Sequence, residues 1–496
     1  MKFITILILF TLLTIQFIKA EDGYKLWLRY NIVSDPQLLD EYNDIIKNVK
    51  IEGSSETMHI IKNVLELGLT GLLGKDNIEY DNTKKNGLLV VGSLENLSNT
   101  FLLRIKDKVI NLGEEGYLIF NEKIDGNITT VITGNTDIGV LYGTFQFLKL
   151  LQTNQNIKNI SIESSPKINL RVLNHWDNLD RTVERGYAGF SIWDWHKLPD
   201  YIDQRYIDYA RANSSIGING TVLTNVNANS LVLTEQYLVK VKALADIFRP
   251  YGIKVYLTAR FSSPIELGGL KTADPLNEDV KLWWKNKVDE IYKLIPNFGG
   301  FLVKANSEGQ PGPQNYGRSH ADGANMLADA LSDYNGVVMW RAFVYSNENQ
   351  DDRAKQAYTE FQPLDGKFRD NVFIQVKNGA IDFQPREPFH PLFGAMPKTP
   401  LMMEFQITQE YLGQGTQLAY LSPLYKECLD SDTYAKGKGS YVSKVIDGSL
   451  DNHAKSGIAG VANIGTDRNW TGHLFGQSNW YTFGRLAWDH ELSSQE

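Results

Sequence analysis

Eight short apolar runs, separated by longer stretches of helical periodicity, follow one another along the chain after Pro166. This alternation is typical of βα units, whose parallel strands are buried between layers of helices. Eight units over about 300 residues match the usual size of a (β/α)8 TIM barrel. We therefore predict an α/β fold built on such a barrel, with a doubly wound open sheet as the competing architecture. The runs cover residues 170–173, 221–226, 254–258, 300–303, 337–344, 372–376, 401–407 and 457–464.

Residues 21–165 form a separate unit by pattern, with strand-like runs at 88–91 and 131–133 and a helix-like stretch at 138–151. The sequence Ser164-Ser165-Pro166 is typical of a turn and marks the boundary. This unit has no cluster of catalytic residue types, so we predict a smaller supporting α/β domain ahead of the barrel. The predicted order is a signal peptide at 1–20, an N-terminal domain at 21–165, a catalytic barrel at 166–485 and the start of a truncated C-terminal region at 486–496.

The first residues have the pattern of a secretory signal. Lys2 is followed by an apolar stretch over 3–17 and then by Lys19-Ala20, ahead of polar residues. An uncleaved signal-anchor is the alternative interpretation of this stretch. No later segment supplies the roughly 20 apolar residues of a membrane span. We expect a protein secreted to the cell exterior or into a digestive vesicle, with no membrane contact after cleavage.

Charge narrows the range of partners. The 496-residue chain carries a net charge of -8, and its pI is near 5.6. Nucleic-acid binders usually display a basic patch or stripe, so we expect no nucleic-acid partner. Six N-glycosylation sequons suit a secreted protein, although Asn219 opens an apolar run in which a glycan would not fit. The sequons are at Asn96, Asn127, Asn159, Asn213, Asn219 and Asn469.

Cysteine and histidine usage argues against several kinds of chemistry. Cys428 is the only cysteine, so no internal disulfide can form and stability must come from core burial. Its acidic neighbours Glu427 and Asp430 would raise the pKa of the thiol, which disfavours a nucleophile. The eight histidines show no close ligand spacing, and neither a dinucleotide-binding glycine motif nor a serine-hydrolase elbow occurs. We expect no metal and no cofactor.

Three carboxylates follow strand-like runs: Glu308 after the fourth, Asp382 after the sixth and Glu410 after the seventh. Barrel enzymes carry their chemistry at the C-terminal ends of the strands. Glycoside hydrolysis needs one carboxyl to protonate the leaving oxygen and another to activate water or attack the sugar. Each acid alone could be a loop residue paired with a base, but three at neighbouring strand ends favour a glycosidase. Glu404, inside the seventh run, could point into the mouth, but we favour a structural partner of a cation.

Three cations, Lys304, Arg341 and Lys377, lie at neighbouring strand ends. They could simply pair with the acids and hold them ionised. Yet three cations exceed what the acids need if one acid stays protonated, and a guanidinium can bind a carboxylate through two parallel hydrogen bonds. This surplus predicts an anionic substrate. Trp176, past the first strand, offers either an aromatic face for a sugar or a plug for the barrel end.

Several longer motifs, which cover nearly the whole mature chain, resemble the glycoside hydrolase family 67 α-glucuronidases. The motifs are Leu173-Asn-His-Trp-Asp-Asn-Leu-Asp180, Glu184-Arg-Gly-Tyr-Ala-Gly189, Lys304-Ala-Asn-Ser-Glu-Gly-Gln-Pro-Gly-Pro313, Lys377-Asn-Gly-Ala-Ile-Asp-Phe-Gln384, Phe405-Gln-Ile-Thr-Gln-Glu-Tyr-Leu-Gly413, Glu21-Asp-Gly-Tyr-Lys-Leu-Trp-Leu-Arg-Tyr30 and Gly134-Asn-Thr-Asp-Ile-Gly139.

The resemblance implies a secreted inverting enzyme of xylan degradation. Its substrates would be xylooligosaccharides, from which it would release glucuronic acid, or the 4-O-methyl ether, by hydrolysing the α-1,2 bond to the terminal xylose. By motif match, Glu308 would be the general acid, and Asp382 and Glu410 would together activate the water. The substrate-binding residues would be Lys304, Arg341 and Lys377 on the uronate carboxylate, Trp176 in the sugar pocket and Val226 at the methyl ether.

One departure from the family concerns the C-terminus. Members usually continue past the barrel into a mostly helical domain that contributes to dimer contacts, whereas this sequence stops at Glu496. The homodimer is therefore left open. Two alternative functions also stay open: a secreted carbohydrate-binding protein with little or no turnover, and a barrel glycosidase acting on another uronide. The intact candidate acids argue against the first, because a binding protein does not need all three.

Overall fold

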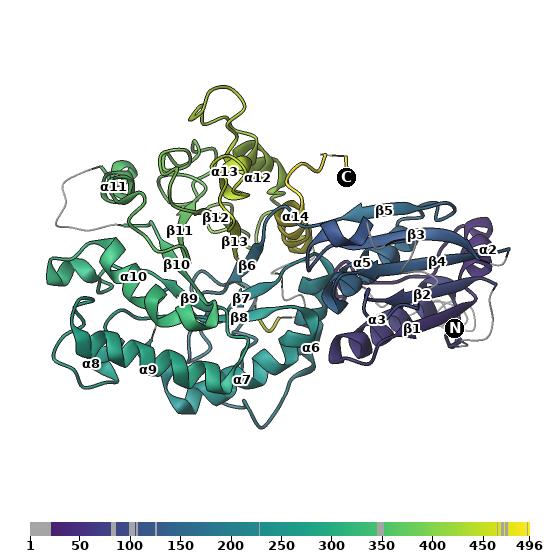
Figure 1. The fold of residues 1–496 in the computed structure, drawn as a ribbon, viewed down its shortest axis with the longest axis horizontal. Coiled ribbons are helices and arrows are strands. Elements are labelled where there is room, and N and C mark those ends of the chain that lie inside the picture. Colours follow the sequence, from purple (N-terminus) through teal and green to yellow (C-terminus); the bar gives the residue numbers. More distant parts are fainter. Residues whose placement is uncertain are drawn as a thin grey trace, which may run out of the picture.

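A closed barrel and a smaller mixed sheet lie side by side in the computed structural model (Figure 1). The structure describes residues 21–80, 86–98, 105, 108–124, 126–227, 229–344, 352–463, 465–467, 471, 475–493 and 495–496. The expected signal peptide and the sequon at Asn469 lie outside these residues. Over the described ranges, no helix has both the length and the apolar character that crossing a bilayer requires.

The N-terminal part contains a five-stranded sheet with helices on it. The elements are α2 (Pro36–Ile45), β1 (Asn48–Glu52), α3 (Glu56–Leu73), β2 (Leu88–Gly92), β3 (Tyr117–Ile124), β4 (Asn127–Gly134), α5 (Asp137–Gln152) and β5 (Ser161–Ser164). The strand order is β1-β2-β4-β3-β5, with β3 antiparallel to both of its neighbours. Helices α3 and α5 pack together, and α5 lies on β3 and β4. No catalytic cluster was expected here, and the boundary at residue 165 stays a prediction.

The barrel consists of eight parallel strands, each at one of the eight apolar runs. They are β6 (Leu170–Asn174), β7 (Gly220–Val222), β8 (Lys254–Thr258), β9 (Gly300–Val303), β10 (Val337–Arg341), β11 (Val372–Lys377), β12 (Leu401–Gln406) and β13 (Gly457–Val461). The barrel closes where β13 pairs with β6. The TIM-barrel prediction is therefore confirmed, and the doubly wound open sheet is wrong.

Several strands end before their apolar runs do, and β7 and β10 illustrate this. β7 ends at Val222 rather than at 226, and β10 ends at Arg341 rather than at 344. Pairing with the neighbouring strands stops there, but the apolar residues beyond remain buried inside the mouth of the barrel, as Val226 and Phe343 show. An apolar run reports burial and not ladder pairing, so the sequence pattern overestimated both strands.

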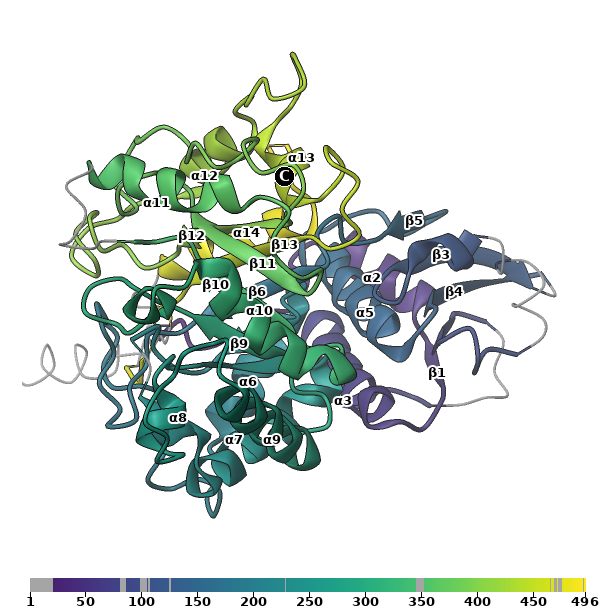
Figure 2. The same ribbon diagram turned by 60° about the vertical axis from the view of Figure 1, so that its left-hand side comes forward.

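Helices surround the barrel on its outside (Figure 2). They are α6 (Gln204–Ser215), α7 (Glu235–Phe248), α8 (Ser263–Glu266), α9 (Glu278–Leu294), α10 (His320–Leu331), α11 (Arg353–Phe361), α12 (Ser422–Leu429), α13 (Val442–Ile446) and α14 (Gly476–Trp488). All residues of β11 and β12 are buried, as expected for strands covered on both faces. Val172, Met339 and Phe373 belong to an apolar cluster that fills the barrel interior. The centre is thus a packed core, and a site must lie at an end.

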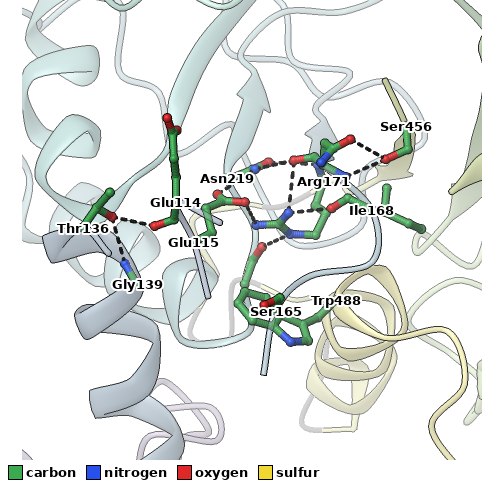
Figure 3. Close-up of polar contacts among 12 residues, drawn as sticks. Glu114, Glu115, Thr136, Gly139, Ser165, Ile168, Arg171, Asn219, Ser456 and Trp488 are labelled. Atoms are coloured by element: carbon green, nitrogen blue, oxygen red, sulfur yellow. Dashed lines mark hydrogen bonds and ion pairs between the residues drawn. The ribbon is translucent and has the colours of Figure 1, made fainter. Parts of the chain in front are cut away.

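The barrel base is joined to the N-terminal part through Arg171, whose side chain is fully buried (Figure 3). Its Nη2 donates to Glu115 at 2.9 Å, and its Nε and Nη1 donate to backbone carbonyls, among them that of Ile168 at 2.6 Å. The second Glu115 oxygen accepts a hydrogen bond from Asn219 Nδ2 at 3.0 Å. Each guanidinium nitrogen therefore has a partner within the chain.

Two sequons are unsuited to glycans in the folded chain. The side-chain amide of Asn219 donates hydrogen bonds to Glu115 and to the Asn169 carbonyl. This agrees with the expectation, drawn from its place before an apolar run, that a glycan would not fit there. Asn213 is a correction, because it is fully buried in α6, donates to the Tyr209 carbonyl and accepts from Trp480. A sequon carries no information on burial, so the sequence did not reveal this.

Candidate active site

One pocket at the C-terminal mouth of the barrel brings together every site residue predicted from the sequence. Its lining residues are Trp176, Glu184, Arg185, Val226, Asn227, Lys304, Glu308, Arg341, Phe343, Lys377, Asp382 and Glu410. These side chains come from the ends of β10 and β11 and from loops that follow β6, β7, β9, β10, β11 and β12. The position agrees with the general rule that the loops after barrel strands carry the site.

Two lysines at the pocket floor pair with more exposed acids. Lys304 binds Glu308, and Lys377 binds Asp382. The lysine side chains are 2% and 5% exposed, whereas those of Glu308 and Asp382 are 50% and 26% exposed. Burial, reinforced by the charge of Arg341, lowers the pKa of Lys304 and lowers that of Lys377 to about 8. An added anion would stabilise the charged form of both lysines.

The third cation is committed to a buried acid. Arg341 donates from Nε and Nη2 to the two oxygens of Glu404 at 2.8 and 2.6 Å. Burial opposes ionisation of Glu404, but Arg341 outweighs it and holds the Glu404 pKa below its usual range. The structural role favoured for Glu404 therefore agrees with the structure. The inferred surplus of cations was wrong, because Glu404 completes a one-to-one pairing of three acids with three cations.

Phe343 lies among the three cations and was missed in the sequence. Its ring centroid is 3.2 Å from Lys377 Nζ, 5.5 Å from Arg341 Cζ and 5.9 Å from Lys304 Nζ. The negative face of an aromatic ring attracts cations, which offsets part of their mutual repulsion. The only signal for Phe343 was its place at the end of an apolar run, and that is equally typical of core.

The two other acids are held through both carboxylate oxygens. Asp382 accepts from Lys377 on one oxygen and from the Tyr411 hydroxyl on the other, at 3.0 Å. Glu410 accepts from Gln406 Nε2 at 2.9 Å and lies 2.6 Å from Arg185 Nε. Fixed carboxylates of this kind are suited to orienting a water molecule or a sugar hydroxyl.

Trp176 lies both at the barrel end and in the lining of the pocket. It is 6% exposed and packs with Val226 and Phe383 in the apolar cluster of the barrel interior, so it closes the barrel end. It also lines the pocket beside Val226. Its Nε1 is buried without a hydrogen-bond partner in the described part of the chain.

Backbone strain gathers at this mouth. Arg185, Asn306, Glu308 and Phe383 have φ values of 57°, 52°, 51° and 57°, in the left-handed region that non-glycine residues rarely adopt. Such conformations persist where surrounding contacts enforce them, and they cluster at functional sites.

The pocket is nearly closed by its own ion pairs. Its free volume is about 30 Å³, whereas ligand pockets usually measure about 300 to 1,000 Å³. A sugar therefore needs more room than the ion pairs leave, and the half-exposed Glu308 is the acid best placed to give way. No group of three or more His, Cys, Asp or Glu residues in the described ranges could hold a metal ion.

Solved structures share this fold. The structure is similar to a GH138 enzyme targeting pectin rhamnogalacturonan II, with a TM-score of 0.52, 16% identity, and coverage of 90% of this chain and 51% of that one. It is also similar to the GH20 exo-β-N-acetylglucosaminidase from Vibrio harveyi, with a TM-score of 0.52, 12% identity, and coverage of 91% and 72%. At these identities the likeness shows the fold alone.

Sequence comparison goes further. Residues 26–147 match the glycosyl hydrolase family 67 N-terminus, and residues 150–470 match the glycosyl hydrolase family 67 middle domain. The chain belongs to glycosyl hydrolase family 67. It is 41% identical to alpha-glucuronidase A of Emericella nidulans over 96% of its length and 57% of that protein. It is 38% identical to an alpha-glucuronidase of Hypocrea jecorina over 99% of its length and 59% of that protein. The chain thus spans under two thirds of the length of these relatives.

Proposed function

We propose that this protein is a secreted α-glucuronidase that removes glucuronic acid, or the 4-O-methyl ether, from the terminal xylose of xylooligosaccharides. The observation that carries the proposal is the pocket itself, in which Glu308, Asp382 and Glu410 face three cations within a family 67 chain. Named relatives at about 40% identity support the same activity.

In the proposed reaction, the bond between the sugar C1 and the xylose oxygen breaks while a water oxygen bonds to C1 from the opposite face. Glu308 donates its proton to the leaving xylose oxygen. Asp382 and Glu410 orient the water, and one of them accepts its proton. The products are free glucuronic acid, with its anomeric configuration inverted, and the shortened xylooligosaccharide. This route needs two carboxyl groups on opposite sides of the bond and room for water between.

Partner exchange explains how a paired and closed pocket can act. A uronate carboxylate can replace the acids as the partner of Lys304 and Lys377 at the pocket floor. Once Lys304 binds the uronate instead of Glu308, Glu308 is free to carry the proton that it must donate. Because Glu308 is the half-exposed member of its pair, it can turn outward and open the pocket, while Tyr411 still holds Asp382. Arg341 stays with Glu404 and offers Nη1, which has no hydrogen bond to a described residue.

The test compares the uronide with the same oligosaccharide in which the carboxylate is reduced to an alcohol. Rapid hydrolysis of the uronide with a loss of about 100-fold or more for the alcohol supports anion recognition, because charged hydrogen bonds from Lys304 and Lys377 contribute about 1.5 to 3 kcal/mol each. Equal rates would contradict it. Binding of the uronide without hydrolysis would favour the alternative of a carbohydrate-binding protein, and turnover only of other uronides would favour the second alternative.

A further inference from the structure

The loop between β6 and α6 reaches the mouth through Glu184, which is fixed by four hydrogen bonds. Its backbone N–H donates to the Trp176 carbonyl at 2.9 Å, and its carbonyl accepts from Asn463 Nδ2 at 2.6 Å. Its Oε2 accepts from Asn225 Nδ2 at 2.9 Å and from Asn227 Nδ2 at 3.1 Å. These contacts reach the loops after β6, β7 and β13, so the backbone at this point is held rigidly.

Arg185 directly follows Glu184, so the hydrogen bonds of Glu184 also fix the position from which the Arg185 side chain extends. Its φ of 57° is unfavourable for an arginine, and the bonds of Glu184 enforce it. The guanidinium reaches the loop after β12, where Nε lies 2.6 Å from Glu410 Oε1. The charge of Glu410 is the main cause that raises the pKa of Arg185.

The exposure of the two partners separates this pair from pairs in which both side chains are exposed. The Arg185 side chain is 53% exposed, but that of Glu410 is only 9% exposed. In the pair of Arg369 and Asp329, both side chains are 57% exposed, and pairs of that kind contribute little. Among the described residues, loss of Arg185 would leave a nearly buried carboxylate with only Gln406 as a donor.

We propose that Arg185 is a positioning residue of the reaction, which acts through Glu410 by holding its carboxylate oriented toward the attacking water. The inference rests on the proposed function. Each carboxylate oxygen can accept two hydrogen bonds. Arg185 and Gln406 occupy one position on each Glu410 oxygen, so each oxygen keeps one for the water.

The experiment measures kcat and KM of the full chain on glucuronylated xylooligosaccharide for wild type, Arg185→Ala and Arg185→Lys. Arg369→Ala is the matched control, because it removes an exposed arginine ion pair away from the pocket. For Arg185→Ala we expect kcat to fall about 10- to 100-fold with KM within about threefold of wild type. Arg185→Lys should recover part of kcat, and free guanidinium, at concentrations far below those that unfold proteins, should restore part of the Arg185→Ala rate because the site is half exposed.

The outcomes separate the two claims. Arg369→Ala should match wild type, and the melting temperature of Arg185→Ala should stay within about 2 °C of it, which excludes loss of folding as the cause. Unchanged kcat in Arg185→Ala, or a raised KM with kcat intact, would overturn the positioning role while the activity stands. A wild type that releases no glucuronic acid would instead overturn the proposed function, and the positioning role with it.

Discussion

Both ends of the barrel contain buried cations, but the partners of these cations differ. At the base, each nitrogen of Arg171 has a partner within the chain, and Glu115 is held through both oxygens. At the mouth, the buried Lys304 pairs with Glu308, whose side chain is 50% exposed, whereas that of Glu115 at the base is 22% exposed. A fully satisfied network favours one fixed arrangement, whereas a buried cation with an exposed partner can exchange it for a ligand.

The comparison teaches that burial alone does not identify function. Both ends contain buried charge beside an aromatic ring, Trp488 at the base and Phe343 at the mouth, and the mouth adds the half-exposed Glu308. The base should therefore govern stability and the mouth should govern activity.

The largest expected effect is on activity at the mouth. Glu308→Gln removes the proton donor while keeping the size of the side chain, so hydrolysis of xylan-derived substrates should fall about 100- to 10,000-fold. Stability should stay close to that of wild type, because the Glu308 side chain is half exposed. Rates of uronic acid release and thermal melts measure the two quantities. A Glu308→Gln variant that is less stable but hydrolyses at the wild-type rate would contradict the assignment of activity to the mouth and stability to the base.

A variant at the base should lose stability and keep its activity. Arg171→Met removes one partner of an ion pair and leaves the Gly217 and Ile168 carbonyls without their donor, while the Asn169 carbonyl keeps Asn219 Nδ2. We expect the free energy of unfolding to fall by about 3 to 5 kcal/mol, measured by urea denaturation, with unchanged kcat for the folded protein. Glu115→Gln, which keeps its acceptor oxygen, should cost less. Loss of kcat at full stability would show that the base takes part in catalysis.

A variant of Lys377 tests the claim that the mouth recognises an anion. Lys377→Met should weaken glucuronate binding about 10- to 100-fold, since a charge-assisted contact contributes about 1.5 to 3 kcal/mol. Binding of unsubstituted xylooligosaccharide should not change. Calorimetric titration with both ligands gives the comparison, and equal losses for the two would contradict a role specific to the carboxylate.

The same lysine gives the binding a pH dependence. Burial and Arg341 lower the pKa of Lys377 to about 8, so Lys377 is charged below that pH and loses its proton above it. Because an anion prefers the charged form, glucuronate affinity should be greatest below about pH 8 and fall by up to tenfold per pH unit above it. Affinity measured across about pH 6 to 10 tests this, and in Lys377→Met the slope should disappear.

The smallest effect concerns glycans. If the protein is secreted, Asn159, which is exposed, should be glycosylated, and the buried Asn213 should not. Mass spectrometry of glycopeptides from the secreted protein compares the two. A glycan on Asn213 would mean that α6 does not pack as described.

How far the sequence predicts this molecule depends on what each pattern reports. Apolar periodicity reports burial, so it located all eight strands and the order of the acids and cations around the mouth. It does not report which charged side chains meet. Glu404 was expected to pair with a cation, but its capture of Arg341 depends on two strands that are distant in sequence. Arg185 lies in a motif shared with the family but was given no role, and Phe343 carries no local signal, because their neighbours become apparent only once the barrel is closed.

The central claim is best tested by incubating the full chain with xylooligosaccharides that bear glucuronic acid on the terminal xylose and following the reaction by NMR. We predict release of free glucuronic acid whose first-formed anomer is inverted, with almost none released by Glu308→Ala. A folded wild type that binds the same oligosaccharide but releases no uronic acid would contradict the account.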